Sequence, residues 1–213
     1  MEILFCRPPQ KRLERIACPH SGAAAVGDTP LKKLTVFKFM EITIKRLELK
    51  DAPVLAEISR KTFYDTFKDT CTPADMEVFL EENYNLTQTE SELNNAEDFY
   101  FFAIVNGKPA GYLRFMEDYT YFPLMKQWKA LELKRLYVLA EYHGQGVAQK
   151  LMDFLLAYAT QQQYKAVWLG VWEDNFRAQN FYAKYGFTDS GHTHDFPIGN
   201  TPQTDKWFWK FLD

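Results

Sequence analysis

The stretch Glu141-Tyr-His-Gly-Gln-Gly-Val-Ala-Gln-Lys150 decides the fold, because it joins a strand pattern to a helix pattern. Gly144 and Gly146 allow the backbone to turn sharply, so that consecutive N–H groups point outward where the helix begins. The partial positive charge of a helix N-terminus adds to these donors. The stretch therefore predicts a cradle for a phosphate or pyrophosphate, or a glycine-containing connection with no further role.

Two common phosphate-binding loops do not fit this turn. A P-loop ends in Gly-Lys followed by Ser or Thr, and the turn has no such ending. A dinucleotide fingerprint needs Gly or Ala three residues after its second glycine, where this chain has Gln149. The turn therefore indicates a different kind of anion site between a strand and a helix.

Strand and helix patterns alternate on both sides of the turn. Residues 131–139 and 167–171 have strand composition, and residues 147–158 between them have helical spacing. Asn106-Gly107 predicts a hairpin. These patterns indicate an α/β domain with a mixed sheet and one βαβ crossover. The other expected elements are strands at 41–47, 99–105, 110–116, 187 onward and 206–212, and helices that begin at Asp51, at Thr72-Pro73, at a Thr87-x-x-Glu90 capping box and at Phe176, the last stopped by Gly186.

The charge changes near Met40. Residues 1–39 carry a net charge of +4, which leaves −7 on residues 40–213. We expect residues 1–39 to be a disordered leader, or a product of an upstream start codon, and residues 40–213 to form the domain. A basic tail that binds a polyanion is one alternative. A metal site is another, but it lacks a paired C-x-x-C spacing; its candidate ligands are Cys6, Cys18 and His20.

Composition excludes several classes of protein. The chain is 46% hydrophobic and 25% charged, which is globular usage and not that of a disordered chain. It has no apolar run of the roughly 20 residues that span a bilayer, so no membrane insertion is expected. A pI of about 5.9 argues against a nucleic-acid partner bound by bulk positive charge. The few cysteines and the absence of a secretory signal predict a cytoplasmic protein.

Two motifs resemble the GNAT family of N-acetyltransferases. Residues 133–138 followed by His143-Gly-Gln-Gly-Val-Ala148 resemble its motif A, Gln/Arg-x-x-Gly-x-Gly/Ala, from which only His143 departs. Asn175-x-x-Ala-x-x-Phe-Tyr-x-x-Tyr-Gly-Phe187 resembles its motif B region. The segment His194 to Asp205 is similar to the PaiA-like subgroup, whose members resemble spermidine/spermine acetyltransferases. The resemblance covers residues 40–213.

The resemblance implies a twisted mixed sheet of about seven strands, with helices on both faces and a central pair of parallel strands that splay apart. Acetyl-CoA would lie between these strands, with its pantetheine on the backbone of Leu136 and Val138. Asn175 would contact the pantetheine, cap its helix, or do both. The pyrophosphate would lie at the turn, on His143, Gly144, Gln145, Gly146, Val147, Ala148 and Gln149.

The same resemblance suggests the catalytic groups. Tyr182 would protonate the leaving thiolate, or else be a core aromatic residue. Glu132 would deprotonate the amine directly or through water, or else be a solvated strand residue. Strand alternation puts Lys134 on the face of Glu132, where it would lower the carboxylate pKa and weaken the base. We expect direct attack in a ternary complex, with the Val138 N–H stabilising the oxyanion.

The expected acceptor is a small-molecule primary amine, with a polyamine favoured over another small amine, an aminoglycoside or a peptide amine. A non-catalytic acyl-CoA sensor is the alternative from another class. No metal is expected, and exposed last strands suggest a homodimer by resemblance. The acceptor-binding candidates are Tyr64, Asp65, Glu117 and His194, with further carboxylates and rings at Asp69, Asp118, Tyr119, Tyr121 and Asp205.

Overall fold

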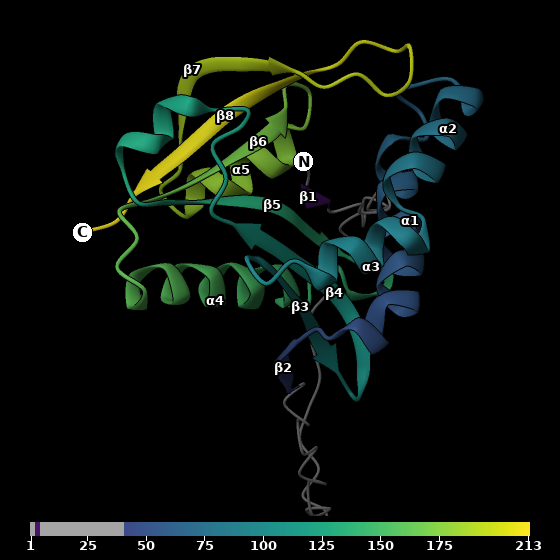
Figure 1. Ribbon diagram of the computed structural model, residues 1–213, viewed down its shortest axis with the longest axis horizontal. Helices are drawn as coiled ribbons and strands as arrows, with labels where there is room; N and C mark the ends of the chain where they lie inside the picture. Colours follow the sequence, from purple (N-terminus) through teal and green to yellow (C-terminus); the bar gives the residue numbers. More distant parts are fainter. Residues whose placement is uncertain (1–2, 5–40) are drawn as a thin grey trace, which may run out of the picture.

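A mixed β-sheet forms the centre of the protein. The computed structural model describes residues 3–4 and 41–213. The strands follow the order β2-β3-β4-β5-β6-β8-β7, with β1 paired to β5 (Figure 1). Their bounds are β1 Ile3–Leu4, β2 Ile42–Arg46, β3 Asp98–Val105, β4 Lys108–Met116, β5 Ala130–Val138, β6 Ala166–Trp172, β7 Thr188–Asp195 and β8 Thr204–Phe211.

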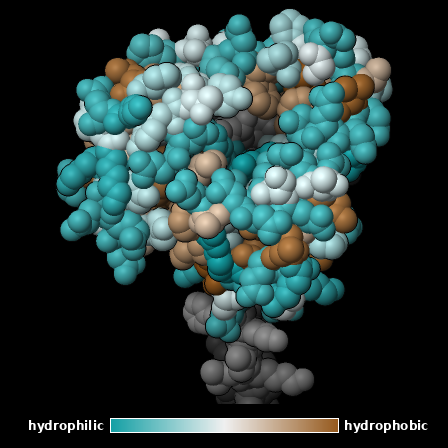
Figure 2. Space-filling model, viewed as in Figure 1, coloured by the Kyte–Doolittle hydropathy of each residue, from teal (hydrophilic) through white to brown (hydrophobic). Residues whose placement is uncertain are grey.

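Helices cover both faces of the sheet. α4 (Val147–Gln161) and α5 (Phe176–Lys184) contribute to one apolar core, and α1 (Ala52–Phe67), α2 (Pro73–Asn83) and α3 (Leu86–Asn94) belong to the opposite face. Short 3₁₀ turns are η1 Leu49–Asp51, η2 Pro123–Gln127 and η3 Ala140–Tyr142. The surface is hollowed between β7–β8 and the α1–α3 side (Figure 2). Among the described residues, no helix combines the length and apolarity needed to cross a membrane.

The local signals in the sequence account for most element ends. Asn106 and Gly107 have φ angles of 50° and 77°, the positive pair that a tight type I′ hairpin requires. Thr72 caps α2 by accepting the Asp75 N–H at 3.1 Å. The capping box predicted at Thr87 is wrong. Asn85 has the extended backbone of a cap and accepts the Gln88 N–H at 2.8 Å, which leaves Thr87 inside the first turn of α3.

The parallel strands β5 and β6 separate part-way along their length. They pair only between residues 130–132 and 166–168, although β5 continues to Val138 and β6 to Trp172. On the other side of β5, Val138 lies opposite Gly111, and the Leu139 N–H donates to the Ala110 carbonyl at 2.9 Å. In an antiparallel pair, every second residue directs its backbone N–H and C=O to the partner strand. Leu139 bonds to β4, so the backbone groups of Leu136 and Val138 point the other way, into the gap. β1 lies along this edge, opposite Leu136 and Tyr137.

A bulge in β5 sets which charged side chains share a face. Arg135 lies opposite Arg114 and Leu133 opposite Phe115, so Lys134 is an extra residue on β5. Glu132, Lys134 and Arg135 consequently all line one cavity on the α1–α3 face. Leu133 belongs to the core under α4 and α5 on the opposite face.

Candidate active site

The turn before α4 has the geometry of an anion cradle. Gly144 and Gly146 have φ angles of 74° and 84°, a conformation that glycine adopts without strain. The first α4 bond runs from the Lys150 N–H to the Gly146 carbonyl at 3.0 Å. The N–H groups of Val147, Ala148 and Gln149 come earlier in the helix and have no intrahelical acceptor. These donors and the helix dipole suit a phosphate group.

Two residues of the cradle are engaged elsewhere. The Gln145 N–H points back to the Tyr142 carbonyl at 3.4 Å, and the Gln145 side chain donates to the Glu141 carbonyl. The His143 Nε2 lies 2.8 Å from the Val138 carbonyl oxygen, at the end of β5. His143 and Val138 line a cavity of about 400 Å³ that extends to α1.

The motif B residues lie on α5. The Asn175 side chain caps this helix by accepting the Ala178 N–H at 3.0 Å. Tyr182 is 1% exposed and packs edge-on against Phe181 and Phe187, with ring centroids 5.7 and 5.6 Å away. Tyr182 therefore belongs to the core of the α4–α5 face, and β1 lies close to its helix.

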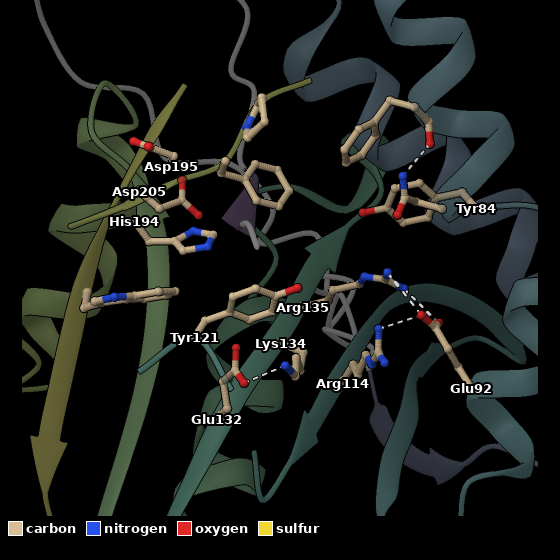
Figure 3. Close-up of a pocket in the computed structure, with 15 residues that line it drawn as sticks. Tyr84, Glu92, Arg114, Tyr121, Glu132, Lys134, Arg135, His194, Asp195 and Asp205 are labelled. Carbon is tan, nitrogen blue, oxygen red and sulfur yellow. Dashed lines mark hydrogen bonds and ion pairs between the residues drawn. The ribbon is translucent and has the colours of Figure 1, made fainter. Parts of the chain in front are cut away.

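A second cavity, of about 430 Å³, opens on the α1–α3 face of the sheet (Figure 3). We call it the acceptor cavity. Its size is that of a small-ligand site, and its walls combine rings with charged groups. The lining residues are Phe79, Asn83, Tyr84, Glu92, Arg114, Tyr121, Glu132, Lys134, Arg135, His194, Asp195, Phe196, Pro197, Asp205 and Trp207.

Glu132 lies where β5 and β6 part. It is opposite Trp168, the last paired residue of β6, and its own exposure is 0%. Lys134 Nζ lies 2.6 Å from a Glu132 carboxylate oxygen and 2.6 Å from Asp118. The expected shared face is confirmed, and Lys134 lowers the pKa of Glu132 as expected, but burial has the larger effect. Burial raises the pKa of Glu132 to about 7, and the opposing effect of Lys134 is smaller.

His194 and Asp205 bring two more titratable groups to the same part of the cavity. Asp205 is 2% exposed, and burial raises its pKa. A Cβ on Gly170 of β6 would lie 3.0 Å from Asp205 Oδ2 and 2.6 Å from Trp207, so this glycine leaves room for both side chains. Burial lowers the pKa of His194, whose ring lies 5.1 Å from that of Trp207.

Buried ion pairs form the other end of the cavity. Glu92 of α3 accepts from Arg114 Nη1 at 2.8 Å and from Arg135 Nη1 at 3.1 Å, and Tyr100 also donates to it. Asp98 holds the Arg114 Nη2 at 2.7 Å and its Nε at 3.1 Å. Burial raises the pKa of Glu92, but the two guanidiniums outweigh it and lower that pKa to about 2.

The structure brings only part of the predicted acceptor set together. His194 lines the acceptor cavity with Glu132. Asp65 lines the cavity beside His143 instead, Tyr64 is 48% exposed, and Glu117 accepts from Tyr119 outside both cavities. Of the further candidates, only Tyr121 and Asp205 line the acceptor cavity.

The sequence interpretation missed Glu92, Arg114 and Arg135. The arginines had a signal, because each is a charged residue directly beside buried apolar strand residues, as in Leu113-Arg-Phe115. Such a charge has to find a partner inside the protein. The metal candidates Cys6, Cys18 and His20 lie outside the described residues, and no cluster of metal-ligand type occurs within the described ones.

Comparisons with known proteins show the family of the chain. Residues 56–187 match the Acetyltransferase (GNAT) family. An uncharacterized N-acetyltransferase in the pepI 3′ region of Lactobacillus delbrueckii subsp. lactis is 34% identical, over 77% of this chain and 94% of its own. An uncharacterized N-acetyltransferase of Mycobacterium tuberculosis is 31% identical, over 74% of this chain and 95% of its own.

The fold of the chain is that of solved acetyltransferases. The PaiA N-acetyltransferase from Thermoplasma acidophilum, in complex with coenzyme A, superposes with a TM-score of 0.65 at 20% identity, over 81% of this chain and 100% of its own. The family match covers more than half of the chain. The chain therefore belongs to the GNAT acetyltransferase family, and it is an acyltransferase of the N-acetyltransferase type.

Proposed function

We propose that the protein transfers an acetyl group from acetyl-CoA to a primary amine bound in the acceptor cavity. One observation carries the proposal. The gap between β5 and β6 opens beside Glu132, and the same carboxyl group lines the acceptor cavity. A thioester in the gap and an amine in the cavity would therefore meet beside a buried carboxyl group.

The gap provides the groups that acetyl-CoA needs. The backbone of Leu136 and Val138 faces it and can pair with the amides of pantetheine. The first N–H groups of α4 can hold the pyrophosphate. Asn175 supports the site by fixing the start of α5. When bound, acetyl-CoA supplies an activated acyl group.

The residues of the site then move protons. An amine arrives as an ammonium ion, and the Glu132 carboxylate accepts a proton, which frees the nitrogen lone pair to attack the thioester carbonyl carbon. The Val138 N–H donates to the carbonyl oxygen as it gains negative charge. The C–S bond breaks as the nitrogen loses its second proton to solvent. Tyr182 gives its phenol proton to the departing sulfur and regains one from water, and Glu132 releases its proton to solvent, which restores both groups.

Three more specific expectations from the sequence remain predictions. These are the polyamine acceptor, the homodimer and the cytoplasmic location. The groups that line the acceptor cavity bear on the first of these predictions.

Release of thiol from acetyl-CoA tests the function. The full chain should release CoA only when an amine is added. Tyr182→Phe should lower kcat about 10²-fold, because the thiolate then leaves without an acid. Tyr158→Phe is the matched control, since its ring packs against Phe99 and Phe115 away from the gap. CoA binding without release for any amine would favour an acyl-CoA sensor instead.

A further inference from the structure

The two ends of the acceptor cavity offer different hydrogen-bonding groups, carboxyl groups and an imidazole at one end and guanidinium N–H donors at the other. Glu132, Asp205 and His194 come from β5, β8 and β7, while Arg114 and Arg135 lie toward α2 and α3 (Figure 3). The cavity therefore suits a ligand with an amine at one end and a hydrogen-bond acceptor at the other.

The guanidinium end is held rigidly. Arg135 Nη1 contacts Glu92 and the Tyr100 hydroxyl, both at 3.1 Å, and its guanidinium carbon lies 4.6 Å from the centre of the Tyr84 ring. These contacts fix the plane of the guanidinium without using all of its five N–H donors. The Arg135 Nη2 donates to Glu92 at 3.4 Å, and among the described residues its Nε donates to no acceptor.

A second ammonium group would meet this end unfavourably. An extended diamine with its reacting nitrogen at Glu132 would carry its other charge toward Arg114 and Arg135. The carboxylates at this end, Glu92 and Asp98, already accept from the two guanidiniums, so an ammonium group there would compete with them for the same oxygens. A carboxylate would be attracted and could accept from Arg135.

The walls between the two ends are aromatic. Tyr84 and Phe79 lie on the α2 side, and Tyr121 and Trp207 lie on the side of Glu132 and His194. A short apolar chain or ring that joins an amine to a carboxylate would pack against these faces.

We propose that the acceptor is an amino acid-like zwitterion, with its amine at the Glu132 end and its carboxylate at Arg135. This proposal rests on the proposed acetyl transfer, and it makes Arg135 a residue that determines specificity.

Matched acceptors test the proposal with the full chain and acetyl-CoA. Each ω-amino acid from glycine to 6-aminohexanoate is compared with the alkylamine and the diamine of the same length, alongside lysine and spermidine. At the best length, we expect kcat/KM to be at least about tenfold higher for the amino acid than for its alkylamine, and lowest for the diamine. Equal or better turnover of diamines or spermidine would overturn the proposal while leaving acetyl transfer intact.

Two variants separate recognition from folding. Arg135→Gln should reduce the preference for the amino acid to less than about threefold, mainly by raising its KM. Arg135→Lys keeps the charge beside Glu92 and should retain part of the preference, whereas a purely structural role would lower kcat/KM for the amino acid and its alkylamine alike. Arg60→Gln, at an exposed ion pair on α1, should change neither the preference for the amino acid nor its KM. An unchanged preference in a folded Arg135→Gln variant would contradict the assignment, and no release with any amine would overturn the acetyl transfer as well.

Discussion

Glu132 illustrates how burial decides the chemistry of a residue. Its side chain has a lysine 2.6 Å away, yet its pKa is raised to about 7. The lysine is shared with Asp118, so its charge is divided between two carboxylates. The loss of water around Glu132 outweighs the remaining attraction. The result is a base that ionises near neutral pH, where general bases work best.

Removing the shared lysine should shift this ionisation. In Lys134→Gln, Glu132 stays buried but loses its favourable neighbour, so its pKa should rise further. We expect the rising limb of the kcat/KM–pH profile to move to higher pH. Lys129→Gln is the control, because Lys129 Nζ bonds the Gln162 carbonyl away from the cavity. A limb that stays in place, or moves to lower pH, would contradict the assigned role of Glu132.

For single residues, the sequence predicts which side chains are neighbours more successfully than it predicts their pKa values. Simple alternation places Glu132 and Lys134 together, and they are. Alternation also assigns Arg135 to the opposite face, which is wrong, because the residue pattern does not predict the bulge at Lys134. Burial depends on the whole fold, so the direction of the Glu132 pKa could not be obtained from neighbours alone.

The turn before α4 is an element whose backbone has a chemical role. Gly146→Ala would put a side chain at a φ angle of 84°, which costs about 1–2 kcal/mol and disturbs the first N–H groups of the helix. We expect a weaker affinity for CoA, measured by calorimetry. Gly107→Ala imposes the same kind of strain in the β3–β4 hairpin, with open space around it. It should lower stability but leave CoA affinity unchanged, and equal effects of both variants on CoA would argue against the cradle.

β1 lies where the pantetheine is proposed to bind. It pairs with β5 opposite Leu136 and Tyr137. One backbone edge cannot serve a strand and a ligand at the same time. Removing residues 1–39 should therefore lower the apparent Kd for CoA in calorimetry, with the thermal unfolding of the shortened chain as the check on folding. A higher Kd after removal would show that this segment supports the site.

Elements were predictable where a local signal governs them. The hairpin at Asn106-Gly107, the Thr72 cap and the stop at Gly186 each depend on one backbone preference, and each is present. The start of α3 was not predictable from the sequence, because Asn85 and Thr87 both have side chains that can cap a helix. The position where α2 ends makes Asn85 the cap.

At the scale of the whole molecule, one charge network joins distant parts of the chain. Glu92 of α3 pairs with Arg114 of β4 and Arg135 of β5, and Asp98 of β3 completes the set. The network ties a helix to three strands of the sheet. It could not be read from the sequence, since its members are brought together only by the strand order and the bulge. Tyr64, Asp65 and Glu117 were expected near His194 but do not line its cavity, because their positions also depend on how the elements are arranged in the whole fold.

Breaking the network should destabilise the fold. Glu92→Gln leaves two buried guanidiniums with one carboxylate, which should lower the free energy of unfolding by about 3–5 kcal/mol. Glu81→Gln, at an exposed pair with Arg60, should cost less than about 1 kcal/mol. Denaturant unfolding measures both. Similar losses in the two variants would mean that the buried network contributes no more than a surface pair.

The same network predicts a pH dependence. The pKa of Glu92 is about 2 in the folded protein, below its ordinary value of 4.5. Its stabilisation is therefore complete above pH 4.5 and is lost as the pH falls toward 2. The wild-type protein should lose more stability over this range than Glu92→Gln.

The most direct test of the account is the pH profile of amine-dependent CoA release, measured for the full chain and for Glu132→Gln. The account predicts a wild-type kcat/KM that rises through a pH of about 7, where Glu132 ionises. Glu132→Gln should lose about 10²–10⁴-fold in rate and should lack that limb. A variant with the wild-type rate and the same rise near neutral pH would contradict the claim that Glu132 is the base at the junction of the gap and the cavity.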